Sequence, residues 1–72
     1  MASEIKSEIT GKIWKVEASV GQKVAAEDQI IVIESMKMEI PVLAPEAGTI
    51  REIRVAEGDD VLEGQVVAVI DG

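Results

Sequence analysis

The sequence predicts an all-β fold, a flattened eight-stranded barrel or sandwich of two four-stranded antiparallel sheets with quasi-twofold symmetry. The main observation is an internal repeat, because the chain matches itself without a gap at a shift of 37 positions. Its apolar residues are mostly β-branched, and glycines separate them into short runs typical of antiparallel strands. The half-repeats span about 9–34 and 46–71, within a single domain of residues 1–72.

The repeat places GKIWKVEASVGQKVAAEDQIIVIE, from Gly11, over GTIREIRVAEGDDVLEGQVVAVID, from Gly48. Gly21 likewise coincides with Gly58, and because glycine adopts positive φ without steric cost, we expect a turn at all four glycines. The aliphatic residues between these glycines are shared as well, at Ile13 and Ile50, Val24 and Val61, Val32 and Val69, and Ile33 and Ile70. The two halves should therefore superimpose.

Eight short strands, in two quasi-equivalent sets of four, follow from this pattern. Corresponding strands of the two half-repeats begin near aligned glycines or contain aligned valines and isoleucines. The expected strands are, in order, 4–9, 12–18, 22–25, 30–35, 38–43, 48–55, 59–62 and 66–70.

The first strand of each half-repeat departs from strict alternation. Its apolar positions are Ile13, Val16 and Ala18 in one copy, and Ile50, Ile53 and Val55 in the other. Because the alternation slips by one residue in both copies, we expect a β-bulge that bends each strand around the core.

The two halves differ at two further positions. Gly64 closes a turn in the second copy, where the first copy has Glu27, so we expect that turn to be strained or differently shaped. Trp14, the single aromatic residue, aligns with Arg51. We expect Trp14 to pack against the core, and a contact with a partner protein is the alternative.

The segment ESMKME, residues 34–39, is predicted to be a hairpin tip at 35–38 rather than a helix, because it is short and Pro41 follows closely. A two-residue hairpin turn normally uses Asn-Gly or Asp-Gly, since both residues need positive φ, yet here the turn holds Met36 and Lys37. A segment that breaks a local rule is a candidate functional site. Methionines at a tip have no core to fill, so we expect them to be displayed. The alternative is that Met36 and Met38 point inward and Lys37 is an ordinary surface charge.

Composition excludes several classes of function. The net charge of −7 disfavours binding to nucleic acids. The chain has no cysteine and no histidine, so we expect no catalytic residue and no metal site. The N-terminal MASEIKSEI lacks the apolar core of a secretory signal, and no run is long enough to span a membrane, which predicts a soluble, cytoplasmic protein. We expect the isolated domain to be monomeric.

The motif ESMKMEIP, with glycine-marked half-repeats on both sides, closely resembles the biotinyl domain of the biotin carboxyl carrier protein family, in its small, thumbless form. The resemblance covers about Ile9 to Asp71. It implies that a biotin protein ligase attaches biotin covalently to Lys37 as an amide. It also implies that Met36 and Met38 help the ligase recognise the tip, and that three further residues frame it: Glu34, Ser35 and Glu39.

The resemblance implies a non-catalytic carrier. Biotin on Lys37 would take a carboxyl group from a biotin carboxylase to a carboxyltransferase, as in the acetyl-CoA carboxylase of fatty acid biosynthesis. The acceptor stays open among acetyl-CoA, other acyl-CoA thioesters, pyruvate and urea. The initial methionine is compatible with a free-standing subunit, and a domain of a larger polypeptide stays open as well.

Two other functions stay open. A lipoyl carrier of a 2-oxoacid dehydrogenase or glycine-cleavage system shares the fold and a modified lysine, usually flanked by Asp and Ala, and some small relatives accept both groups. An unmodified β-domain used only for protein contacts would also fit the repeat symmetry.

Overall fold

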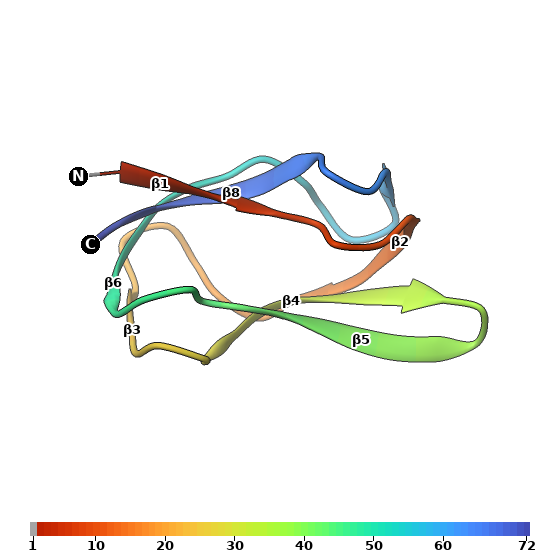
Figure 1. Ribbon diagram of the computed structural model, residues 1–72, viewed down its shortest axis with the longest axis horizontal. Helices are drawn as coiled ribbons and strands as arrows, with labels where there is room; N and C mark the ends of the chain where they lie inside the picture. Colours follow the sequence, from red (N-terminus) through yellow and green to blue (C-terminus); the bar gives the residue numbers. More distant parts are fainter. Residues whose placement is uncertain (1) are drawn as a thin grey trace.

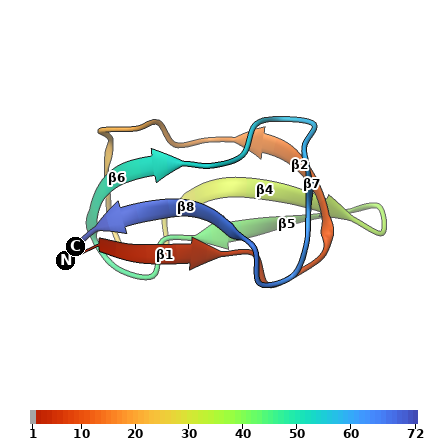
Figure 2. The ribbon, with the colours of Figure 1, turned by 90° about the horizontal axis from the view of Figure 1, so that it is seen from above.

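The computed structural model describes residues 2–72, which form eight strands and two stacked sheets (Figures 1 and 2). The sheet orders are β1-β8-β6-β3 and β5-β4-β2-β7, and every neighbouring pair is antiparallel. The strands are β1 (Ala2–Lys6), β2 (Gly11–Val16), β3 (Lys23–Val24), β4 (Gln29–Ser35), β5 (Met38–Leu43), β6 (Gly48–Ile53), β7 (Asp60–Val61) and β8 (Val66–Asp71). The predicted fold class is confirmed.

The strand bounds agree closely with the prediction. Strand β5 has the predicted bounds, and β1 begins and ends earlier than the predicted 4–9. The remaining strands differ from their predicted ends by one or two residues at most. Within residues 2–72 there is no helix long and apolar enough to cross a membrane.

The repeat is visible in the strand pairing, as the two predicted equivalent sets of four strands. Strands β2, β3 and β4 correspond to β6, β7 and β8, and β1 also corresponds to β5. Glu34 of β4 pairs with Glu39 of β5. The equivalent residues, 37 positions away in the sequence, are Asp71 of β8 and Ala2 of β1, and these two residues also pair. Each sheet therefore contains strands from both halves of the chain.

The core lies between the sheets and is a single aliphatic cluster. Its largest fully buried apolar side chains are Ile13, Ile30, Ile31, Ile33, Ile50, Ile70, Val61 and Val67. Burial of such side chains contributes roughly 1.5–3 kcal/mol each, so this cluster is the main source of stability in a chain without disulfides.

The two predicted bulges are present. The register shifts between Ile13 and Lys15 in β2 and between Ile50 and Glu52 in β6. Each bulge keeps an isoleucine in the core and turns the next residue outward. As a result Trp14 is 48% exposed, and the prediction that it packs against the core is wrong.

The four repeated glycines serve two different purposes. Gly21 and Gly58 have φ values of +90° and +92° in turns, as predicted. Gly11 and Gly48 instead lie within strands, so the prediction of turns there is wrong. A Cβ atom on Gly11 would lie 2.5 Å from the carbonyl oxygen of Glu34, and one on Gly48 would overlap the equivalent carbonyl in β8. These two glycines allow close approach of neighbouring strands.

The turn at Glu27 is strained, as its mismatch with glycine predicted. Glu27 has a φ of +71°, and its counterpart Gly64 has a φ of +86°. The Glu27 amide donates a hydrogen bond to the Ala44 carbonyl oxygen at 2.8 Å, which holds this conformation. The left-handed region costs a non-glycine residue roughly 1–2 kcal/mol.

The molecule is elongated, with extents of 33 × 17 × 17 Å. The start of β1 and the C-terminus lie together at one end of the long axis, where Ala2 pairs with Asp71, and the turn between β4 and β5 projects at the opposite end (Figure 1). The symmetry that relates β1 to β5 thus relates the chain ends to this turn.

We predict that Glu27→Gly raises the free energy of unfolding by about 0.5–1 kcal/mol, because relief of the positive φ outweighs the added freedom of the unfolded chain. The control is Ala26→Gly at the neighbouring exposed position, which should lower stability by roughly 0.4–1 kcal/mol. Urea unfolding measures both changes, and a shared sign would contradict a strained backbone at Glu27.

Candidate functional site

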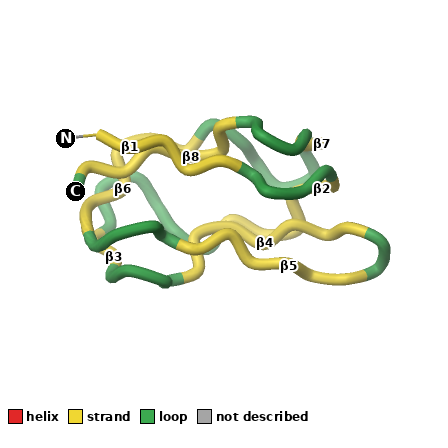
Figure 3. The backbone as a smooth tube through the Cα atoms, in the orientation of Figure 1, coloured by secondary structure: helices red, strands yellow, loops and turns green. Residues whose placement is uncertain are grey.

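The candidate site is the tip of the β4–β5 hairpin, the longest projection of the molecule (Figure 1). The two strands pair continuously toward the tip, where Ser35 faces Met38 in the last pair. Only Met36 and Lys37 form the loop (Figure 3). The predicted hairpin at 35–38 is therefore present, and a paired ladder supports Lys37 on both sides.

Both loop residues have left-handed backbones. Met36 has a φ of +51° and Lys37 a φ of +64°, the signs that a two-residue turn of type I′ requires. Neither residue is Gly, Asn or Asp, the residue types that adopt this conformation most easily. The tip therefore keeps its lysine despite an unfavourable backbone conformation.

The side chains of the tip are displayed to solvent. Met36 is 92% exposed, Met38 is 62% exposed, and Lys37 is exposed between them. The expectation that the methionines are displayed is confirmed, and an inward orientation is wrong. Among residues 2–72 no carboxylate forms an ion pair with Lys37.

Two acidic residues lie directly beneath the tip. Glu34 and Glu39 face each other across β4 and β5, and both are exposed. Lys12 of β2 faces Glu34 from the other side. Like charges directly opposite each other destabilise a sheet slightly, so the Glu34–Glu39 pair does not itself add to the stability of the fold.

The outer end of the hairpin, next to the turn, is tied to the rest of the domain by side chains. The Ser35 hydroxyl donates a hydrogen bond to the Thr10 carbonyl oxygen at 2.9 Å. The Thr10 hydroxyl accepts one from the Glu63 amide at 3.1 Å. Thr10 and Glu63 were not predicted from the sequence. The repeat does mark Thr10, because its counterpart is Ala47 and only Thr10 has a side-chain hydroxyl.

Other polar features lie away from the tip. Arg51 and Asp71 form an ion pair at 3.6 Å on the outer face of the β1–β8–β6 sheet. On the same sheet Glu52 accepts a hydrogen bond from Arg54 at 2.9 Å, and this bond raises the pKa of the Arg54 guanidinium. All of these side chains are exposed, so such pairs contribute little to stability.

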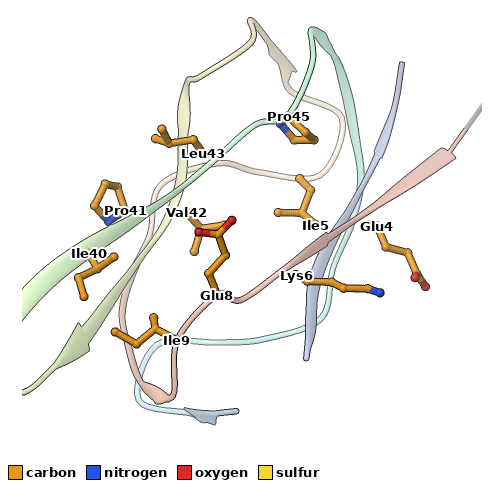
Figure 4. A pocket seen from close by; sticks show the side chains of 10 residues that line it. All are labelled: Glu4, Ile5, Lys6, Glu8, Ile9, Ile40, Pro41, Val42, Leu43 and Pro45. Carbon is orange, nitrogen blue, oxygen red and sulfur yellow. The ribbon is translucent and has the colours of Figure 1, made fainter. Parts of the chain in front are cut away.

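A groove of about 500 Å³ runs between the edge strands β1 and β5 (Figure 4). Its walls are largely apolar, with Ile5 and Ile9 on one side and Ile40 and Val42 on the other. Lys37 does not line this groove. The hairpin tip itself is thus a projection and not a pocket.

The geometry offers a single chemical group at the tip, a primary amine on a flexible stem. The chain has no histidine or cysteine, and residues 2–72 contain no cluster of His, Cys, Asp or Glu arranged to hold a metal ion. The Lys37 amine is therefore accessible to covalent modification, because it lies in an exposed turn at the end of the hairpin.

Comparison with known proteins gives consistent results. Residues 1–70 match the family described as "Biotin-requiring enzyme". The chain is 40% identical over 70 residues to a biotinylated protein TB7.3 homolog of Mycobacterium leprae, a match that spans 97% of this chain and 99% of that protein. It is 36% identical over 63 residues to a biotin/lipoyl attachment protein of Bacillus subtilis, spanning 88% of this chain and 86% of that protein.

A solved structure is also similar. The crystal structure of the Kluyveromyces lactis urea carboxylase matches 99% of this chain with a TM-score of 0.94 and 44% sequence identity. The matched region is 6% of that protein, so most of the larger enzyme has no counterpart here.

We predict that Lys37→Gly is more stable than Lys37→Ala by about 1 kcal/mol, because only glycine adopts the left-handed conformation freely. Both changes remove the same charge, so the comparison isolates the backbone. At an ordinary strand position the order is the reverse. Urea unfolding midpoints measure the difference, and a more stable alanine variant would contradict the strain assigned to this turn.

Proposed function

The chain belongs to the family of biotin-requiring enzymes, and from this premise we propose that it carries biotin on the side-chain nitrogen of Lys37. The chain is a non-catalytic biotin carboxyl carrier. The observation that supports Lys37 as the attachment residue is its position at the apex of a projecting two-residue turn, with its side chain in solvent.

The tip fits covalent biotin. Amide formation at the Lys37 nitrogen requires that a ligase reach the amine, and no ion pair within residues 2–72 restrains it. When bound, biotin supplies the ureido nitrogen that carries the carboxyl group. The chain contributes placement: the β4–β5 ladder fixes the position of the Lys37 backbone, and the lysine stem supplies the freedom to move between active sites.

We assign supporting roles to the neighbouring residues. Met36 and Met38 present two flexible apolar side chains on either side of Lys37, a surface that a ligase can recognise. The paired carboxylates of Glu34 and Glu39 mark the approach to the tip with negative charge. Both features lie within the β4–β5 hairpin, next to Lys37.

The proposed partners are a biotin protein ligase, a biotin carboxylase and a carboxyltransferase. Tethering raises the effective concentration of the carried group at both active sites, which is the contribution of a carrier. We further propose a monomeric domain that serves an acyl-CoA carboxylase, as in fatty acid biosynthesis, in the cytoplasm. Reconstitution with candidate carboxylase components and each acceptor tests this part.

A lipoyl group on Lys37 is the second candidate. The similarity to the Bacillus subtilis biotin/lipoyl attachment protein favours it, because that name covers both groups. The geometry of the tip suits either attachment, since both need only an accessible lysine amine.

We predict that the wild-type protein, isolated from its host, carries one biotinyl group and that peptide mapping locates the group on Lys37. Lys37→Arg should abolish the modification, because a guanidinium does not act as the acceptor amine. It should leave the free energy of unfolding within about 0.5 kcal/mol of wild type, because Lys37 is exposed. Intact-mass spectrometry and urea unfolding provide the two measurements.

Lys23→Arg is the matched control, because Lys23 is an exposed lysine that lies in β3 and not in the turn. It should be modified as wild type. A lipoyl adduct in place of biotin would support the second candidate. An unmodified Lys37 in the presence of active ligase would leave a domain used only for protein contacts.

A further inference from the structure

We infer that Ser35 and Thr10 are positioning residues that hold the Lys37 turn in the orientation a modifying ligase requires. This inference rests on the proposed function, since it concerns how the same lysine is presented. The two hydrogen bonds that link Ser35 to Thr10 and Thr10 to Glu63 form a side-chain brace, which we call the tip brace.

The tip brace joins three segments that are distant in sequence. Ser35 is the last residue of β4 before the turn, Thr10 precedes β2, and Glu63 belongs to the turn that follows β7. The Ser35 hydroxyl and the Thr10 carbonyl oxygen lie 2.9 Å apart, and the Glu63 amide lies 3.1 Å from the Thr10 hydroxyl. The brace thus anchors the hairpin just below Met36 to a loop outside the hairpin.

The pseudo-symmetry of the fold separates this role from ordinary structural support. At the opposite end of the molecule the three equivalent positions are Gly72, Ala47 and Ala26, none of which has a side-chain hydroxyl. The backbone there is otherwise similar, because Gly11 and Gly48 make the same close approach to a neighbouring strand. The equivalent positions at that end therefore form no such brace, and the side-chain hydrogen bond found there joins other positions, Ser3 and Glu46.

The tip has a specific need for such a restraint. The hairpin projects beyond the sheets, so its outermost residues have neighbours on few sides (Figure 1). Met36 and Lys37 also occupy backbone conformations that other residue types adopt more easily. The hydrogen bond from Ser35 to Thr10, directly below the turn, narrows the range of orientations of the hairpin tip. A preorganised substrate binds its enzyme more tightly.

The test measures biotin ligation of unmodified domain by a biotin protein ligase with ATP and biotin, over a range of domain concentrations. Ser35→Ala should raise the KM for the domain about two- to tenfold, the range for loss of one hydrogen bond, and leave kcat unchanged. Ser35→Thr keeps a hydroxyl and should restore the wild-type KM. Amide hydrogen exchange at Met36, Lys37 and Met38 should be faster in Ser35→Ala than in wild type.

The matched control is Ser3→Ala. Ser3 also donates an exposed hydrogen bond, to Glu46 at 3.2 Å, but in β1, whose counterpart under the symmetry is β5. Its removal should change neither the KM nor exchange at the tip. An unchanged KM for Ser35→Ala, an equal effect of Ser3→Ala, or failure of Ser35→Thr to restore the KM would overturn the inference.

Failure of the proposed function has a different signature. If the ligase does not modify the wild-type domain, biotin on Lys37 is wrong. The exchange measurement then decides on the brace alone, and unchanged exchange at the tip in Ser35→Ala overturns it.

Discussion

The structure depends on one constraint: the two halves of the chain must bury their isoleucines and valines against each other. Each sheet contains strands from both halves, so neither half has a complete sheet of its own. In a domain of 72 residues this single aliphatic cluster supplies most of the stabilising burial. We therefore expect the halves to fold as one cooperative unit. A rigid base for the hairpin follows from this cooperativity.

The pseudo-symmetric scaffold is used asymmetrically. Its buried positions repeat faithfully, as Ile33 and Ile70 illustrate, because both occupy equivalent places in one shared core. Several of its differences lie at the hairpin, where Met36 and Lys37 adopt positive φ and Ser35 is tied to Thr10. The buried residues common to both halves thus provide the stability, and residues found in only one half present the lysine. A carrier needs this division, because the accessible group must project from a scaffold that does not change.

The sequence was sufficient for the fold and for the backbone of the tip, because both leave local signals. The repeat predicted the sheets, and the absence of Asn-Gly at Met36 and Lys37 predicted unusual backbone. Other features depend on contacts between distant residues. The sequence alone does not distinguish a glycine required for the close approach of two strands, such as Gly11, from a glycine required in a turn. The outward direction of Trp14 depends on which residue the bulge displaces. The contact of Ser35 with Thr10 joins residues that no periodicity relates.

The placement of both chain ends opposite Lys37 has a mechanical consequence. Polypeptide joined to either end would leave at the pole farthest from the amine, so the domain itself would serve as a rigid lever between tether and cargo. Its length of 33 Å is comparable to the average reach of a flexible linker of roughly 35 residues. Unlike a flexible linker, the lever does not fold back on itself. A pivot at the ends would therefore move the cargo over a wide arc.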